Sequence, residues 1–101
     1  MKIAVIIPSY KVKRHIIGIL EKIPSYVDKI YVIDDDCPEG SGKEVLKRHH
    51  PDRVKVVFNE HNKGVGGAVK TGFLEALKDQ CDIIVKLDGD GQMNPEEMSL
   101  L

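Results

Sequence analysis

Two aspartates and a glutamine alternate with glycines in the segment Asp88-Gly89-Asp90-Gly91-Gln92. The apolar residues 83–85 before it are typical of a buried strand, and Asn94-Pro95-Glu96-Glu97 after it is typical of a helix start. Carboxylate and amide oxygens are ligands that Mg²⁺ and Mn²⁺ prefer, and phosphate oxygens can complete a shell that the protein leaves unfilled. The segment therefore predicts a site where a divalent ion holds a diphosphate. The alternative is an ordinary Asp-Gly turn.

An EF-hand calcium loop is excluded for this segment. Such a loop needs Asp or Asn at the position of Gln92, glycine at Met93 and a bidentate glutamate at Ser99. Magnesium or manganese remains as the metal that the oxygen ligands suit.

Three adjacent aspartates, Asp34-Asp35-Asp36, follow a second apolar run at residues 29–33. Alternate residues of an extended segment point to opposite sides, so one aspartate can face a ligand while its neighbours face solvent or cap backbone amides. A carboxylate that accepts hydrogen bonds from ring N–H groups can hold a nucleotide base. The alternative is a charged exit loop without a ligand.

A glycine-rich loop at residues 64–69 resembles two phosphate-binding motifs and matches neither. Val69 stands where both GxGxxG and the Walker A motif need glycine, and the loop follows the third predicted strand rather than the first. Two interpretations remain: a helix amino terminus whose amides lie near a phosphate, or small residues that let a helix pack closely on a sheet.

Strands are predicted at residues 3–7, 29–33, 53–58 and 82–87, with a helix between each pair. The third helix is expected to bury one apolar face, formed by Val65, Val69, Phe73, Ala76 and Leu77. Such alternation predicts an α/β fold, a parallel sheet with helices on both faces. Ligands of such sheets bind outside the carboxyl ends of the strands, which here follow Ile7, Ile33, Phe58 and Leu87.

Composition narrows the function classes. The chain has 101 residues, 42% hydrophobic and 31% charged, which suits a single domain spanning residues 1–101. Its 15 basic and 16 acidic residues give a net charge of −1, so no nucleic-acid partner is expected. Cys37 and Cys81 form no CxxC pair, which favours a cytoplasmic setting with reduced thiols. The apolar runs are too short to span a membrane, so membrane association is expected only through parts outside this chain.

With these motifs assembled, the chain resembles the amino-terminal part of family 2 glycosyltransferases of the GT-A fold, in particular the polyprenol- or dolichol-phosphate sugar transferases. The resemblance extends over essentially all 101 residues and implies a truncated, Rossmann-like nucleotide-sugar-binding half. It rests on four motifs in the family's order: Ile6-Ile7-Pro8-Ser9-Tyr10, Val32-Ile33-Asp34-Asp35-Asp36-Cys37-Pro38-Glu39-Gly40, Asn62-Lys63-Gly64 with residues 66–72, and Asp88-Gly89-Asp90-Gly91-Gln92.

The resemblance implies roles for individual residues. Asp35 would hydrogen-bond the base, and the nucleotide pocket would further include Pro8, Ser9, Tyr10, Ile33, Lys70, Asp88 and Gly89. The metal ligands, for Mg²⁺ or Mn²⁺, would be Asp88, Asp90 and Gln92. One departure is that the family's usual Tyr-Asn-Glu reads Tyr10-Lys11-Val12 here, which removes the contact of that glutamate. The family's catalytic base lies beyond the DxD motif, so no catalytic residue is assigned in this chain.

The implied function is the donor half of a metal-dependent glycosyltransferase. Its donor would be a UDP- or GDP-linked sugar, and its acceptor a lipid phosphate or a saccharide. A rival function is a non-enzymatic, Mg²⁺-binding receiver-like signalling module, but such a module has its acid pair after the first strand, where this chain has Pro8-Ser9-Tyr10. A nucleotidyltransferase or another nucleotide-sugar enzyme is a second rival, and a degenerate structural domain is a third.

Overall fold

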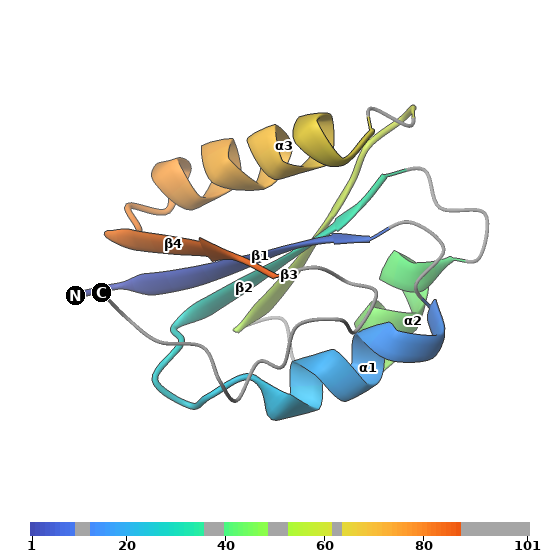
Figure 1. Cartoon of the computed structure of the whole chain (residues 1–101), viewed down its shortest axis with the longest axis horizontal. Coiled ribbons are helices and arrows are strands. Elements are labelled where there is room, and N and C mark those ends of the chain that lie inside the picture. Colours follow the sequence, from blue (N-terminus) through green and yellow to red (C-terminus); the bar gives the residue numbers. More distant parts are fainter. Residues whose placement is uncertain (10–12, 36–39, 49–52, 62–63, 88–101) are drawn as a thin grey trace.

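Strands and helices alternate along the chain in the computed structural model, which describes residues 1–9, 13–35, 40–48, 53–61 and 64–87 (Figure 1). The elements follow the predicted order. They are β1 (Ile3–Ser9), α1 (Lys13–Lys22), β2 (Lys29–Asp34), α2 (Ser41–Arg48), β3 (Val54–Phe58), α3 (Gly64–Lys78) and β4 (Ile83–Lys86). Of the described helices, none is both long enough and apolar enough to cross a membrane.

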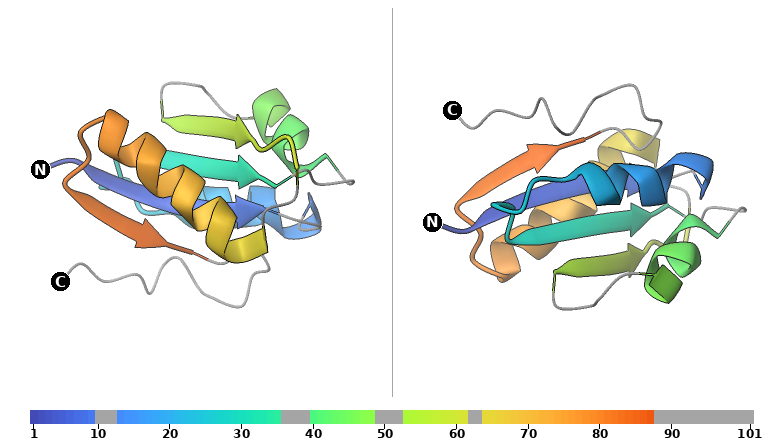
Figure 2. Two further views of the ribbon diagram at one scale, coloured as in Figure 1. Left: turned by 90° about the horizontal axis from the view of Figure 1, so that it is seen from above. Right: turned by 90° about the horizontal axis from the view of Figure 1, so that it is seen from below.

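The four strands form one parallel sheet in the order β3-β2-β1-β4. Helices α1 and α2 lie on one face and α3 on the other, as Figure 1 shows from the side and Figure 2 from above and below. The predicted α/β fold with a parallel sheet covered on both faces is therefore confirmed. Because β2 and β3 are added on one side of β1 and β4 on the other, the strand order reverses between β1 and β4. Such a switch point is where open α/β sheets bind ligands.

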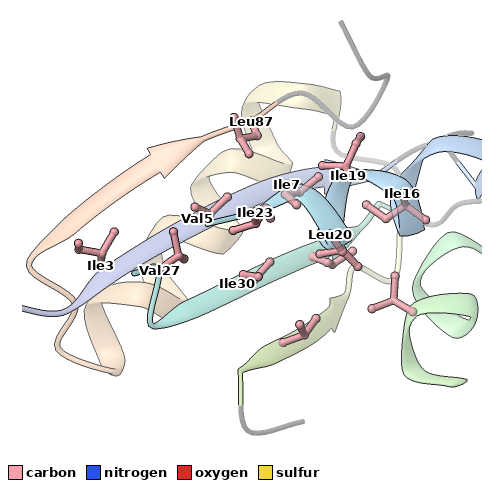
Figure 3. Close-up of a cluster of buried hydrophobic side chains, with 13 residues drawn as sticks. Ile3, Val5, Ile7, Ile16, Ile19, Leu20, Ile23, Val27, Ile30 and Leu87 are labelled. Atoms are coloured by element: carbon pink, nitrogen blue, oxygen red, sulfur yellow. The ribbon is translucent and has the colours of Figure 1, made fainter. Parts of the chain in front are cut away.

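The continuous apolar run of β1 is buried on both faces of the sheet. Ile3, Val5 and Ile7 point toward α1, where they pack against its apolar side chains (Figure 3). Ala4 and Ile6 point toward α3. This alternation continues to the end of the strand and decides which face each site residue occupies.

Helix α3 packs on the sheet with a stripe of small residues, so the predicted apolar face is wrong. Ala68, Gly72 and Ala76 are buried, whereas Phe73 and Leu77 are 46% and 50% exposed. A Cβ added to Gly72 would lie 2.5 Å from Cγ2 of Ile6 and 3.2 Å from Cγ1 of Ile33. Larger side chains cannot fit between α3 and the sheet, so they occupy the outer face. Among the side chains of the predicted face that the structure describes, only Ala76 is fully buried.

The glycine-rich segment belongs to α3 rather than to a loop before it. The helix begins at Gly64, which has a φ of +77°, and Gly66 and Gly67 lie within its first turn. Close helix-on-sheet packing holds for Ala68, which is buried, but not for Gly64 and Gly66, where an added Cβ would meet nothing within 4 Å. The other interpretation, amides of the helix start near a phosphate, stays a prediction.

Candidate functional site

The chain leaves β1 and β4 side by side at the carboxyl edge of the sheet. Ile6 pairs with Lys86 in the parallel ladder, and the amide of Leu87 donates a 2.9 Å hydrogen bond to the Ile6 carbonyl. Leu87, the last residue described in this part of the chain, therefore lies beside β1. The predicted site residues Tyr10, Asp88, Gly89, Asp90 and Gln92 lie outside the described residues, so their roles stay predictions.

Asp34, the last residue of β2, caps the start of α2. Its buried carboxylate accepts a 2.9 Å hydrogen bond from the amide of Gly42. The approach is close enough to require glycine, since a Cβ on Gly42 would lie 2.7 Å from Asp34 Oδ2. One of the three aspartates thus caps backbone, as predicted for the neighbours of a ligand contact.

Asp35 points to the opposite face, toward α3, and is only 3% exposed. Its Oδ1 accepts a hydrogen bond from Nδ2 of Asn59, and its Oδ2 accepts one from the amide of Gly64, both at 2.9 Å. The carboxylate therefore joins the ends of β2 and β3 to the start of α3. The role of Asp35 as the base contact stays a prediction.

Asn59 and Thr71 were not predicted from the sequence. Asn59 directly follows β3, at a position where functional residues were expected, but no motif singled it out. Its Oδ1 lies 3.3 Å from the hydroxyl of Thr71, which also donates to the Gly67 carbonyl at 3.0 Å. The one feature of the sequence that could have identified Asn59 is that it is a polar residue directly after a strand. Its partners are 12 and 24 residues away in sequence, so only the fold identifies them.

The other predicted pocket residues of the described strands divide between the two faces. Pro8 and Ile33 pair across β1 and β2 on the face toward α3, which is also the side of Asp35. Ser9 points the other way and is completely buried, and its Oγ has no hydrogen-bond partner among the described residues. A buried hydroxyl without a partner costs about 1–3 kcal/mol. Such groups call for a local explanation, and a ligand edge is one.

Lys70 is exposed on α3. It lies two residues from both Ala68 and Gly72, which in a helix is nearly the opposite side. Because those two residues face the sheet, Lys70 points away from it. This placement does not support the predicted approach of Lys70 to the nucleotide.

Within the described residues, no three His, Cys, Asp or Glu side chains lie close enough together to hold a metal ion. The predicted ligands Asp88, Asp90 and Gln92 come directly after them. Two carboxylates and an amide oxygen are a donor set that fits Mg²⁺ or Mn²⁺ and leaves positions for phosphate oxygens.

A second polar cluster ties the other end of α3 to the sheet, at the amino edge. The buried hydroxyl of Tyr31 donates a 2.6 Å hydrogen bond to Asp79 Oδ2, and Lys55 forms a 2.9 Å ion pair with Glu75. Burial raises the pKa of the Tyr31 phenol, while the hydrogen bond from Tyr31 lowers the pKa of the Asp79 carboxyl. These contacts are structural and lie at the edge opposite the candidate site.

The family model described as Glycosyl transferase family 2 matches residues 4–101, which is nearly the whole chain. The chain belongs to glycosyl transferase family 2. A polyprenol monophosphomannose synthase of Mycolicibacterium smegmatis is 33% identical to it over 101 residues, which cover 96% of this chain. The chain spans 38% of the length of that relative. The predicted family is therefore confirmed, and a polyprenol-linked enzyme is among its relatives.

Two solved structures share the fold of this family 2 chain. A mannosyltransferase, PcManGT from Pyrobaculum calidifontis in complex with GDP-Man and Mn²⁺, superposes with a TM-score of 0.71 at 21% identity over 88% of this chain and 27% of its own. S. aureus TarS in complex with UDP gives a TM-score of 0.72 at 27% identity over 95% of this chain and 29% of its own. The likeness confirms the predicted GT-A, Rossmann-like fold.

Proposed function

We propose that this family 2 chain binds the nucleotide end of a sugar-nucleotide donor in a metal-dependent glycosyltransferase. The observation that carries the proposal is the pairing of β1 with β4. This pairing puts Leu87, the residue before Asp88 in sequence, beside β1 at the switch point of the sheet, which supports a site in the segment Asp88-Gly89-Asp90-Gly91-Gln92. Asp35 directly follows the neighbouring strand β2 at the same edge. Residues 1–101 would thus form one donor-binding unit.

In the complete reaction, an oxygen of the acceptor attacks the anomeric carbon of the sugar. A glycosidic bond forms while the bond from that carbon to the diphosphate oxygen breaks, and the nucleoside diphosphate leaves with the electron pair. In this chain, Asp35 would accept an N–H of the base, with Pro8, Tyr10 and Ile33 lining the pocket. A divalent ion held by Asp88, Asp90 and Gln92 would supply positive charge for the departing diphosphate.

The donor class follows from two relatives in fold that differ in base. The PcManGT structure contains GDP-Man and the TarS structure contains UDP, so we propose a GDP- or UDP-linked sugar. The M. smegmatis relative is a polyprenol monophosphomannose synthase, and we propose a polyprenyl phosphate acceptor on that basis. Transfer to a saccharide in place of the lipid would contradict this part of the proposal. We also propose a cytoplasmic location, because the two cysteines of the sequence form no CxxC pair and Cys81 is a free, buried cysteine.

Calorimetric titration with UDP and GDP, with and without Mn²⁺, tests the donor site. We expect affinity for one of the two nucleotides to depend on the metal and to fall at least about tenfold in Asp90→Ala. Asp82→Ala is the matched control, because Asp82 is an exposed aspartate before β4, at the opposite edge of the sheet. A nucleotide affinity that changes neither on removal of Mn²⁺ nor in Asp90→Ala would contradict the proposal.

Two further assays separate the rival functions. We expect the 101-residue chain alone to bind nucleotide without turnover, so robust sugar transfer by it would contradict a donor-half function. Phosphorylation of the chain by acetyl phosphate with Mg²⁺ would instead support a receiver-like module.

A further inference from the structure

We infer that Asn59 is a positioning residue for the base site: its side-chain amide holds the Asp35 carboxylate in the orientation that receives the base. The inference rests on the proposed function, in which Asp35 is the base contact. It adds a residue that no motif of the sequence identified.

The backbone of Asn59 is held by the sheet. Its amide donates a 2.9 Å hydrogen bond to the Asp34 carbonyl, which extends the pairing of β2 and β3 by one step beyond Phe58. The residue is only 8% exposed, and its side chain lies between Asp35, which follows β2, and Thr71 of α3. The backbone of Asn59 thus has a fixed position at the carboxyl edge, with β2 between it and β1.

The orientation of the Asn59 amide follows from its two neighbours. An ionised carboxylate only accepts hydrogen bonds, so the amide nitrogen must face Asp35, where Nδ2 donates to Oδ1 at 2.9 Å. The amide oxygen then faces the hydroxyl of Thr71, at 3.3 Å. A flipped amide would place its oxygen against the Asp35 carboxylate, so that two acceptors would meet and the donor to Asp35 would be lost.

Two donors on different oxygens fix the Asp35 carboxylate. Asn59 holds Oδ1 and the amide of Gly64 holds Oδ2, so the carboxylate cannot turn about its Cβ–Cγ bond without losing a hydrogen bond. A contact that is oriented before the ligand arrives avoids the ordering cost that a mobile side chain incurs on binding. Removal of the Asn59 amide leaves only one of these two restraints.

The second polar cluster shows what a purely structural link looks like in the same molecule. Tyr31 and Asp79 also connect β2 with α3 by a hydrogen bond to a carboxylate, but at the amino edge, away from the switch point. If both clusters were merely structural, a change in either would affect stability alone. The positioning role predicts that only the Asn59 cluster also affects the affinity for the base.

The test compares a ligand that has a base with one that lacks it. Binding of GDP and UDP with Mn²⁺, and of inorganic pyrophosphate with Mn²⁺, is measured for the wild type, Asn59→Asp, Thr71→Val and Tyr31→Phe. Asn59→Asp keeps the shape of the side chain and replaces the donor by a second carboxylate. We expect its nucleotide affinity to fall about tenfold, with pyrophosphate affinity unchanged.

Two signatures separate positioning from general damage. The nucleotide affinity of Asn59→Asp should recover as the pH falls, relative to the wild type, because a proton shared by the two carboxylates restores a donor to Asp35. Thr71→Val, which retains the Asn59 donor, should weaken nucleotide binding by about twofold to threefold, again without an effect on pyrophosphate. Tyr31→Phe should lower the melting temperature and leave both affinities as they are.

Equal weakening of nucleotide and pyrophosphate binding by Asn59→Asp, or no weakening of either, overturns the inference and leaves Asn59 a structural residue. If Asn59→Asp does not fold, Thr71→Val decides by the same comparison. A wild type that shows no metal-dependent affinity for GDP or UDP contradicts the proposed function itself.

Discussion

Asp34 and Asp35 are neighbours in sequence, yet the fold gives their carboxylates different partners. The carboxylate of Asp34 caps α2 at Gly42, whereas that of Asp35 lies on the other face, against Asn59 and Gly64. Strand alternation predicted that adjacent aspartates would diverge. It did not predict which one caps a helix, because the answer depends on where α2 and α3 return to the sheet.

The two aspartates should differ when each is replaced. Asp34→Ala removes a cap, and we expect it to lower the free energy of unfolding by about 0.5–2 kcal/mol, with little change in nucleotide affinity. Asp35→Asn removes the charge that accepts the base N–H in the proposed function, and we expect a loss of nucleotide affinity of about tenfold or more. Denaturant unfolding and calorimetry measure the two effects. A large affinity loss in Asp34→Ala would reverse the assignment.

Lys70 provides a negative prediction. Because its side chain is exposed on the face of α3 away from the sheet, we expect Lys70→Ala to leave the affinity for GDP and UDP within about twofold of the wild type. The same titrations measure it. A tenfold loss would restore the nucleotide contact that the family resemblance implied.

At the scale of elements, α3 shows why its orientation was not predictable from hydrophobic periodicity. The periodic pattern selected large residues such as Phe73 and Leu77, which are half-exposed. The sheet instead meets Ala68, Gly72 and Ala76, because β1 and β2 present Ile6 and Ile33 at short range. The pattern scores apolar character and not size, so it missed a face formed by small residues.

The close approach of α3 is testable with a matched pair of glycine substitutions. Gly72→Ala places a methyl group 2.5 Å from Ile6 Cγ2, and we expect it to lower the free energy of unfolding by about 1–3 kcal/mol. Gly66→Ala is the control, because a Cβ at this position would meet nothing within 4 Å. Since alanine favours the helix more than glycine does, we expect this substitution to raise the free energy of unfolding by up to about 0.5–1 kcal/mol. Denaturant unfolding measures both. Equal effects of the two substitutions would contradict the packing of α3.

At the scale of the whole molecule, the two edges of the sheet carry different polar groups. The carboxyl edge has Asp34, Asp35 and Asn59, next to the exits of β1 and β4, and the amino edge has the cluster around Tyr31 and Asp79. The continuous apolar strands made the parallel sheet and its ligand edge predictable. The amino-edge cluster was not predictable, because Tyr31 and Asp79 are 48 residues apart.

The amino-edge cluster should make stability depend on acid pH. The hydrogen bond from Tyr31 lowers the pKa of Asp79, and the hydrogen bond from Lys55 lowers that of Glu75. Groups whose pKa is lower in the folded state stabilise it above their ordinary pKa, and this contribution is lost as the pH falls. We expect the free energy of unfolding to decrease from about pH 5 downward, and less steeply in Tyr31→Phe. Urea unfolding across this range is the measurement. Identical slopes for the two proteins would contradict the role of Tyr31.

The central claim is that a metal-bound nucleotide occupies the carboxyl edge between β1 and β4. Paramagnetic broadening of backbone amide signals tests it most directly, because Mn²⁺ broadens the signals of nearby amides. On addition of Mn²⁺ with GDP or UDP, we expect loss of the signals of Ser9 and Leu87, with those of Asp28 and Cys81 at the amino edge retained. Loss at the amino edge, or uniform broadening that the nucleotide does not change, would contradict the claim.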